Sequence, residues 1–529
     1  MTKKRVAIVG GGAAGCSLLW CLTSQDGPLS EVEATLFHDE SVVGGHSHTI
    51  NVWFDSSGTG HVADASTTET VYPVDIGVQF VCPTLYPNLY LQLKNDVFEN
   101  AVPLKNHPAL KISGAFQDDV NWGNFPEYQS GAQFGNCYDP ATVEDAERFQ
   151  RDLHQAPFKR FHGKAMIQMT VGEYLEAAGF SQQSKFFRYL LVPYLSIING
   201  YGTTDLLLTT IEDLFPIFTK LPLIQEKGPY AAFTAPGKGW DRFERGAQQW
   251  VEVMATYATQ RGAVVKTSTY VTAVTPQIDG RVKVTYKQRD PGGGADVESS
   301  ELFDSVVLTT DMTTNRELLG TPDNRLYPLQ EPYIGPSQFE LIPGICYIHQ
   351  DESVVSPTLR EGLEDGQFCG YYAWGSSPTN PFGMPYDLTN AYQTYFMQNI
   401  LGTPAPCYVS MYAIADHAKR PDPAKTIHVK TWRHGRWVAS FFDDAKKNLH
   451  EIQGLGNVWF AGNNTTVDSE EGALLSAMIV AEKVSSYRYP NPVISEAFFL
   501  YKYFKGTMFP RQTLASRIAW DLTRTLPSS

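Results

Sequence analysis

The sequence has few of the features that mark a disulfide scaffold or a zinc module. Its seven cysteines are scattered along 529 residues, are odd in number and never form a Cys-x-x-Cys pair. An odd set cannot pair completely within one chain, and no zinc-ligand spacing occurs. We therefore expect reduced thiols, no metal site and a cytoplasmic protein.

Long hydrophobic runs are also missing. No apolar stretch reaches the roughly eighteen residues that a transmembrane helix needs, so no such helix is expected. The start MTKKRVAIVGGGAAG places a basic stub before an apolar run, as a signal peptide does, but glycines interrupt the run within a few residues. The final Pro-Ser-Ser matches none of the simple address signals.

Charged residues are sparse and unbalanced. They make up 19% of the chain, and 56 acidic against 42 basic side chains give a formal net charge of −14. Phosphate polymers are bound by clustered cations, so nucleic acid is disfavoured as a partner. Aromatic residues, by contrast, reach 12% and supply material for apolar pockets. The length exceeds what one core usually fills, which predicts two or more packed units.

Strands and helices alternate at the start of the chain. Residues 5–9 and 32–37 are short, apolar and β-branched, and residues 13–22 form an apolar helix opened by glycines. Strand, helix and strand in this order form the minimal unit of a parallel sheet. A further buried strand is predicted at 305–310, whereas residues 170–200 are predicted to be helical, with a capping box at their start.

The strongest chemical signal is a glycine motif between the first strand and the first helix. Gly10-x-Gly12-x-x-Gly15 supplies a tight turn, a close approach to a pyrophosphate and close helix–strand packing, in that order. The free N–H groups at the start of the helix, at Ala13 and Ala14, would hold the phosphates. We therefore expect a dinucleotide site.

Three further segments resemble one family of flavoproteins. Gly44-Gly45-His46-Ser47-His48-Thr49 resembles the second glycine motif of the flavin amine oxidase and phytoene desaturase superfamily, and residues 74–80 resemble its Asp-x-Gly segment. Residues 457–484 resemble its closing motif, with Ala461-Gly462 after a strand and Gly472-Ala473 opening a helix. The resemblance spans most of residues 5–485.

The resemblance implies bound FAD and an α/β fold, in which a Rossmann-like FAD-binding unit is interleaved with an α+β substrate unit. The FAD unit is expected to take residues 1–105, 230–315 and 445–490, and the substrate unit residues 106–229 and 316–444. The implied FAD contacts are Gly10, Gly12, Ala13, Ala14, Gly15, His38, Asp39, Gly44, Gly45, His46, Gly77, Val78, Gln79, Phe80, Val271, Gly462, Asn463, Glu471, Gly472 and Ala473.

One position departs from the family pattern. The family has Glu at the end of the second strand to bind both ribose hydroxyls, but this chain has His38 there, followed by Asp39. A neutral imidazole offers one hydrogen bond where a carboxylate can accept two. Either Asp39 takes over the contact or the ribose is held less tightly. Val271 matches the position whose backbone meets adenine.

Within the superfamily, the chain most resembles polyunsaturated fatty acid double-bond isomerases and predicted amine oxidases. The lysine that many true amine oxidases place over the flavin cannot be assigned here, which disfavours an amine substrate. The first hypothesis is an oxidoreductase that abstracts hydride from a C–H bond of a lipophilic or aromatic small molecule. The alternatives are a redox-neutral double-bond isomerase of a polyene and a non-enzymatic flavin scaffold or redox sensor. FAD is expected to be noncovalent.

Catalytic side chains are harder to assign, because the flavin itself takes the hydride. His434 and His349 are acid–base candidates because histidine titrates near neutral pH, although most such histidines are structural. Trp432 is predicted to lie next to the flavin. Further aromatic candidates for a substrate cavity, which could equally fill the core, are Tyr408, Tyr412, Trp437, Phe441 and Phe442. Glu470 and Glu471 precede the last family helix, where carboxylates also serve as ordinary helix stabilisers.

The last thirty-nine residues differ from the rest of the chain. Residues 491–529 carry five cations against two acidic residues, beside a cluster of aromatics. This composition predicts peripheral membrane contact. The favoured alternative is a C-terminal helix that packs back onto the FAD unit.

Overall fold

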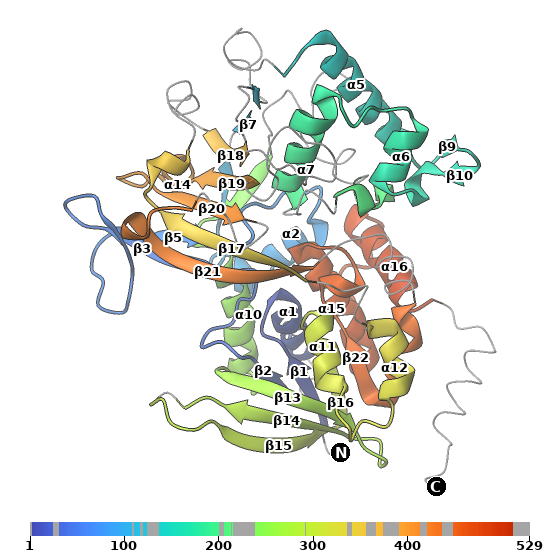
Figure 1. Ribbon diagram of the computed structural model, residues 1–529. Helices are drawn as coiled ribbons and strands as arrows, with labels where there is room; N and C mark the ends of the chain where they lie inside the picture. Colours follow the sequence, from blue (N-terminus) through green and yellow to red (C-terminus); the bar gives the residue numbers. More distant parts are fainter. Residues whose placement is uncertain are drawn as a thin grey trace.

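The protein contains two main sheets, one above the other in Figure 1, with helices around each. The computed structural model describes residues 3–24, 31–107, 111–116, 120–123, 137–199, 206–212, 214, 239–290, 292–335, 341–355, 367–373, 391–412, 420–435 and 448–510. The lower sheet contains the N-terminal strand, and the upper sheet is built from segments in the middle of the chain.

The lower sheet has five parallel strands in the order β12-β2-β1-β16-β22. Their bounds are β1 Lys4–Val9, β2 Val32–Phe37, β12 Val264–Lys266, β16 Ser305–Leu308 and β22 Val458–Phe460. Both faces are covered, which explains why β1 is a continuous apolar run and not an alternating one. Val6 and Ile8 contact the helices of one face, whereas Ala7 and Val9 contact the core of the other.

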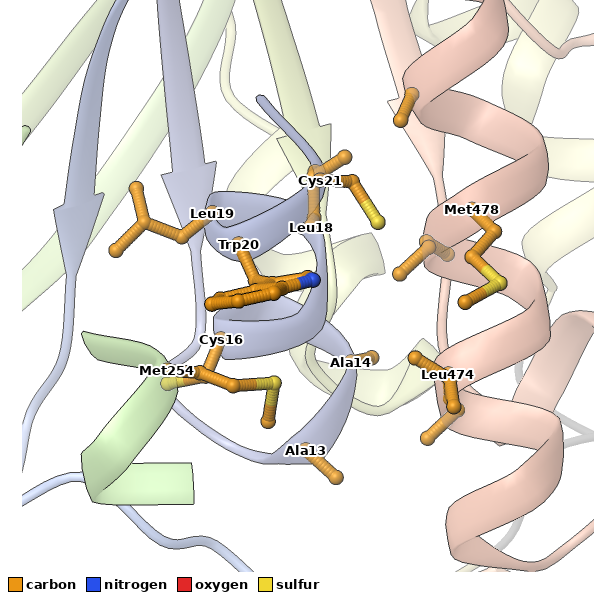
Figure 2. Close-up of a cluster of buried hydrophobic side chains, with 14 of the residues drawn as sticks. Ala13, Ala14, Cys16, Leu18, Leu19, Trp20, Cys21, Met254, Leu474 and Met478 are labelled. Atoms are coloured by element: carbon orange, nitrogen blue, oxygen red, sulfur yellow. The ribbon is translucent and has the colours of Figure 1, made fainter. Parts of the chain in front are cut away.

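Helices α1, α10 and α15 share a core on the first face of this sheet (Figure 2). They span α1 Ala13–Thr23, α10 Gln248–Gln260 and α15 Glu470–Val484. Every residue of α1 is buried, and Trp20 contacts both Phe98 and Tyr257 edge-on or tilted. The strands and helix predicted for residues 5–37 are therefore confirmed to within one residue at each end.

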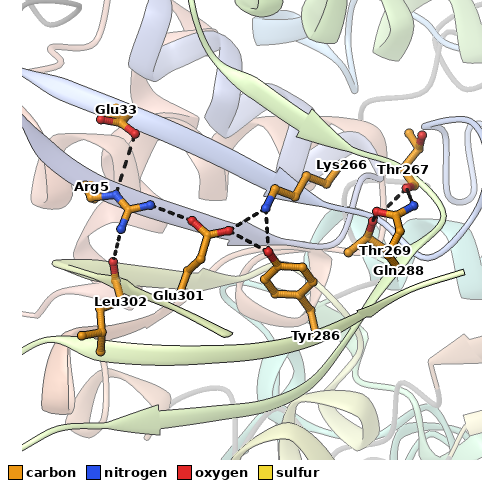
Figure 3. Close-up of polar contacts among 9 residues, drawn as sticks. All are labelled: Arg5, Glu33, Lys266, Thr267, Thr269, Tyr286, Gln288, Glu301 and Leu302. Carbon is orange, nitrogen blue, oxygen red and sulfur yellow. Dashed lines mark hydrogen bonds and ion pairs between the residues drawn. The ribbon is translucent and has the colours of Figure 1, made fainter. Parts of the chain in front are cut away.

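The other face of the parallel sheet packs against an antiparallel sheet and two helices. These are β13 Thr269–Pro276, β14 Val282–Gln288, β15 Val297–Phe303, α11 Met312–Leu319 and α12 Tyr327–Ile334. Glu301 of β15 receives hydrogen bonds from Arg5 at 2.7 Å, Lys266 at 2.6 Å and Tyr286 at 2.8 Å (Figure 3). Burial opposes ionisation, but these donors outweigh it and lower the pKa of Glu301 to about 2.

The upper sheet has seven strands in the order β21-β17-β20-β19-β18-β7-β8. They span β7 Lys111–Phe116, β8 Asn121–Gly123, β17 Leu341–His349, β18 Gln367–Ala373, β19 Ala391–Phe396, β20 Tyr408–Tyr412 and β21 Thr426–Gly435. Its pairings are antiparallel except that of β18 with β7. Cys346 and Ile348 face a core shared with helices, and Tyr347 between them joins a cluster of buried tyrosines on the opposite face.

Helices over the upper sheet come from the middle of the chain. They are α5 Pro140–His154, α6 Val171–Ala177 and α7 Val192–Asn199, with a π-helical turn at Phe186–Leu191. The capping box predicted at the start of 170–200 is confirmed, since Thr170 and Glu173 cap each other's backbone N–H. The predicted continuous helix is wrong: α6 ends at Ala177, and Gly179 beyond it adopts φ +71°.

The remaining described elements are short or lie at the ends. They are β3 Thr49–Phe54, β4 Gly60–Val62, β5 Tyr72–Asp75, α2 Pro87–Leu93, α3 Asp96–Glu99, β6 Leu104–His107, β9 Arg160–Phe161, β10 Lys164–Ala165, β11 Trp240–Phe243, α14 Met397–Leu401 and α16 Glu496–Met508. All seven cysteines are free and buried, as expected. Across the described segments, no helix has the length and apolarity needed to cross a bilayer.

Candidate functional site

The glycine motif forms a tight loop between β1 and α1. Gly10 adopts φ +110°, a conformation that side chains disfavour. A Cβ at Gly15 would lie 1.9 Å from the carbonyl oxygen of Gly10, so only glycine allows the helix this close to the loop. At Gly12 the nearest atom to such a Cβ is 3.8 Å away. The space beside Gly12 is therefore open. Gly10 is required by its backbone conformation, and Gly15 is required by the close packing of the helix on the loop.

Within the part of the chain that the structure describes, the N-terminus of α1 has no side-chain cap. Its first turn contains no acidic residue. Ala13 and Ala14 in this turn have no side chain that could reach back to the helix end. Backbone N–H groups and the helix dipole together make such an end a site for an anion.

The second glycine motif lies directly against this loop. Gly44 donates its N–H to the Gly11 carbonyl at 2.9 Å, and Gly12 and Gly44 form a parallel β-bridge. Gly45 adopts φ +60°, and a Cβ there would lie 3.0 Å from the Gly12 Cα. The two motifs, separated by about thirty residues of sequence, thus form one surface.

The segment after β5 packs under the second motif. A Cβ at Gly77 would lie 1.9 Å from the His46 carbonyl oxygen, which explains the glycine. Val78 donates its N–H to the same oxygen at 3.4 Å, Gln79 hydrogen-bonds the Asp75 carbonyl, and Phe80 is buried.

Asp75 itself is fully buried beside this segment. Its carboxylate accepts hydrogen bonds from Thr49 Oγ1 at 2.6 Å and from the Ala247 N–H at 2.9 Å. Burial outweighs these donors and raises the pKa of Asp75 to about 7. Asp75 therefore joins β3, β5 and the start of α10 below the glycine loops.

His38 is buried against the glycine loop, whereas Asp39 is exposed. The His38 Nδ1 accepts the Gly11 N–H at 3.2 Å, and the ring occupies the position where a Gly11 Cβ would stand. Burial lowers the pKa of His38, so the ring is neutral at pH 7. The histidine thus uses one of its nitrogens within the loop, which leaves Asp39 as the more accessible of the two predicted ribose ligands. Their binding roles stay predictions.

Val271, predicted to meet adenine, lies in β13 close to the same loop. Ser268 and Thr269, at the start of that strand, donate their N–H groups to the Glu40 and His38 carbonyls at 2.7 Å each. The chain after β2 and the start of β13 are therefore neighbours, and the contact of Val271 with adenine stays a prediction.

The closing motif turns from β22 into α15. Gly462 adopts φ +119° and donates its N–H to Ser476 Oγ at 2.8 Å, and Asn463 hydrogen-bonds Asp468 at 2.6 Å. A Cβ at Gly472 would lie 2.0 Å from the Val467 carbonyl oxygen. Ala473 follows as a buried residue of α15.

Two buried glutamates stand at the N-terminus of α15. Glu470 accepts a hydrogen bond from Ser47 Oγ at 2.6 Å, which ties the closing motif to the second glycine motif. Glu471 accepts the backbone N–H groups of Asn88 at 3.0 Å and Leu89 at 2.9 Å, at the start of α2. Burial raises the pKa of each carboxyl to about 7. The sequence suggested both acids but not the partners, which lie about four hundred residues away.

The edge strand β21 of the upper sheet reaches this region. Trp432 stacks on His46 with ring centroids 5.0 Å apart, and its buried Nε1 has no hydrogen-bond partner among the described residues. Lys430 forms an ion pair with Glu40 at 2.5 Å. Burial and Lys430 lower the pKa of His48, which lies 3.9 Å from Glu40. Glu40 and Lys430 gave no signal in the sequence because the pair forms only when the two sheets meet.

Of the histidine candidates, the structure locates one side chain. His349 is fully buried, with Nε2 2.8 Å from Ser410 Oγ and Nδ1 accepting the Asp351 N–H at 3.2 Å. Burial lowers its pKa to about 3, and this environment does not fit the expected acid–base role. His434 pairs with Ile342 through its backbone, and its side chain lies outside the described part.

Of the aromatic candidates for a substrate cavity, the structure describes two and leaves three outside the described residues. Tyr408 and Tyr412 are buried in the tyrosine cluster of the upper sheet, with Tyr412 5.7 Å from Tyr347 and 4.9 Å from Tyr392 between ring centroids. The alternative that they fill the core thus agrees with their packing. Trp437, Phe441 and Phe442 lie outside the described residues.

Comparisons with known proteins support the fold. No family model matches the chain, and no curated protein matches its sequence. Among solved structures, a CLA-producing fatty acid isomerase from P. acnes has a TM-score of 0.53 at 14% identity, over 90% of this chain and 98% of its own. A putrescine oxidase bound to putrescine has a TM-score of 0.54 at 12% identity, over 91% and 99%. An oxidoreductase from Methanosarcina mazei has a TM-score of 0.52 at 11% identity, over 90% and 100%. The chain shares its fold with these structures, which agrees with the family resemblance of its motifs.

Proposed function

We propose that the chain binds FAD noncovalently and uses it to abstract a hydride from a C–H bond of a mostly apolar organic substrate. The observation that carries this proposal is the surface formed by the glycine loops of residues 10–15 and 44–46 at the uncapped start of α1. The residues present fit the cofactor, because a pyrophosphate needs this close backbone approach and free N–H groups. Bound FAD supplies the hydride acceptor.

Each segment of the site would contact a different part of the cofactor. Gly12, Ala13 and Ala14 bind the pyrophosphate through backbone N–H groups, and Asp39 accepts hydrogen bonds from the adenosine ribose. The second glycine motif, the Asp-x-Gly segment and the start of α15 would hold the flavin end of the cofactor. The Trp432 indole on His46 excludes water from one side and offers its unpaired Nε1–H as a donor.

The direct test is a spectrum of the purified protein. We expect a yellow protein with the absorbance of oxidised flavin, and release of intact FAD when the protein is denatured with acid. A colourless protein whose thermal stability does not change on adding FAD would contradict the proposal. Flavin that stays with the denatured chain would contradict the noncovalent link alone.

A redox-neutral isomerase is the second candidate, because one structural neighbour is a fatty acid isomerase. Such an enzyme returns the hydride elsewhere on the same substrate and needs no external acceptor. Anaerobic incubation separates the two reactions. With a polyunsaturated fatty acid, an oxidase stops after one reduced flavin per site, whereas an isomerase continues to form product. Putrescine serves as the polar comparison substrate, for which we expect no reaction.

A further inference from the structure

The C-terminal helix α16 has two different faces. Ala497, Tyr501, Phe504 and Met508 are buried, at the spacing of one helix face, in the core that α1 and α15 share. Tyr501 donates its hydroxyl to Glu482 at 2.5 Å, and Lys505 pairs with the same carboxylate. The expected C-terminal helix that packs on the parallel-sheet core is therefore present, and its inner face is fixed.

The outer face of α16 is unusual because it is aromatic. Phe499 is 62% exposed and Tyr503 is 54% exposed, with the exposed Lys502 between them. Just before the helix, Val493 and Ile494 are 72% and 78% exposed. The outer face of a surface helix normally carries polar side chains. Four large side chains exposed within eleven residues thus mark an interaction surface.

A second exposed phenylalanine lies just before the β9–β10 hairpin in the sequence. Phe158 follows α5 and is 88% exposed, beside the β9–β10 hairpin. Of the phenylalanines whose side chains the structure describes, only Phe158 and Phe499 are exposed. The hairpin and α16 project on the same side in Figure 1.

Two contacts connect the segment 206–212 to α16 and to the start of α6. Tyr503 donates its hydroxyl to Glu212 at 2.6 Å, and Thr210 forms a β-bridge with Thr170 at the start of α6. Glu173 of α6 pairs with Lys164 of the hairpin at 2.7 Å. The segment 206–212 therefore contacts α16 on one side and the start of α6, next to the hairpin, on the other.

Charged side chains accompany the exposed aromatic residues of both elements. Arg160 in the hairpin and Lys502 on α16 are exposed, while Glu212 and Glu496 border the helix. The sequence after the last described residue adds three arginines and one aspartate in nineteen residues. Arg160 and Lys502, which flank exposed aromatic side chains, thus lie on a molecule whose formal net charge is −14. Aromatic side chains with flanking cations suit the boundary between lipid headgroups and acyl chains.

We propose that α16, the residues just before it and the β9–β10 hairpin dock on the surface of an anionic lipid bilayer. Phe499, Ile494 and Phe158 enter the acyl boundary, and the cations lie among the headgroups. The inner face of α16 stays packed on the core, so the helix lies on the membrane and does not cross it. This proposal does not depend on which substrate the flavin site accepts.

Vesicle flotation of the full-length protein tests the proposal. We expect binding to mixed phosphatidylcholine–phosphatidylglycerol vesicles, much weaker binding to phosphatidylcholine alone, and weakening by salt, because surface charges are screened. Phe499→Ser should lower the affinity about tenfold, because the variant loses an apolar side chain that would leave water on binding. Lys502→Glu should weaken binding only to the anionic vesicles.

Ile278→Ser is the matched control. Ile278 is a large apolar side chain that is 78% exposed, as Ile494 is, but it lies in the turn between β13 and β14. It should bind vesicles like the unaltered protein. Both variants change exposed side chains, and unchanged thermal unfolding with unchanged flavin content shows that they fold. The proposal is overturned if the unaltered protein binds neither vesicle, or if Phe499→Ser binds as well as Ile278→Ser. It is also overturned if Phe499→Ser converts a dimer into a monomer without changing vesicle binding.

Discussion

Helices α1 and α15 begin in the same way and differ in electrostatics. Each follows a strand of the parallel sheet and contains a glycine whose Cβ would strike the carbonyl five residues earlier, Gly10 from Gly15 and Val467 from Gly472. The first turn of α1 has no side-chain cap and no acidic residue. Helix α15 is capped by Ser469, and its first two residues, Glu470 and Glu471, are buried acids. The described side chains satisfy the start of α15, whereas none of them caps the start of α1.

The shared geometry is tested by adding one methyl group to each helix. Gly15→Ala and Gly472→Ala should both lower the free energy of unfolding by roughly 3–5 kcal/mol or prevent folding, because the new Cβ meets backbone that cannot move aside. Denaturant unfolding of the apoprotein measures the loss. Gly506→Ala, where nothing lies within 4 Å of a new Cβ, is the control and should not destabilise. If Gly15→Ala unfolds like this control, the tight loop is not required.

The electrostatic difference is tested at Gly12. Its φ of −80° and open surroundings accept a side chain, and aspartate is a good N-cap. Gly12→Asp should therefore leave the apoprotein as stable as before or more stable by about 1 kcal/mol. Its charge should nevertheless weaken FAD binding about a hundredfold, since like charges placed together cost several kcal/mol. Titration of apoprotein with FAD, followed by flavin fluorescence, measures this affinity.

Gly12→Asn separates charge from size in the same experiment. Asparagine caps a helix as well as aspartate does and has nearly the same volume, but it is neutral. It should retain clearly more FAD than Gly12→Asp does. Equal losses in the two variants would mean that the side chain blocks the site sterically and that the open helix end is not an anion site.

The comparison also shows what sequence patterns can predict. The loop and helix at α1 depend on residues within one short stretch, so the glycine spacing placed them correctly. The partners of α15 come from elsewhere: Ser47 reaches Glu470 across 423 positions, and Asn88 reaches Glu471 across 383. A carboxylate before a helix is compatible with many partners, and only the fold selects one. The same holds for Trp432 on His46, which needs the edge of the upper sheet to meet the glycine loop.

The buried carboxyls of α15 make stability depend on pH. Burial raises the pKa of Glu470 and Glu471 from 4.5 to about 7, so the folded state holds protons that the unfolded state releases. This stabilisation is complete below about pH 4.5 and is lost as the pH rises through 7, by roughly 3 kcal/mol at most for each carboxyl. Glu470→Gln should therefore flatten the decline in unfolding free energy between pH 5 and pH 8.

Glu496→Gln is the matched control for this pH series, because Glu496 is an exposed acid in the first turn of α16. It should decline with pH in parallel with the unaltered protein. Denaturant unfolding of the apoprotein at several pH values gives the slopes. A Glu470→Gln slope identical to that of the control would show that Glu470 is ionised in both states.

The smallest effect is expected from removing the cap that distinguishes α15. Ser469 accepts the Gly472 N–H at 3.1 Å, and Ser469→Ala leaves that donor without its partner. Loss of such a cap costs about 1 kcal/mol. Ser469→Asp should restore most of the cap, but it adds a third acid next to Glu470 and Glu471 and so recovers less at pH 8 than at pH 5. If Ser469→Ala is as stable as the unaltered protein, the two carboxyls alone suffice for this helix end, and the contrast with α1 rests on charge.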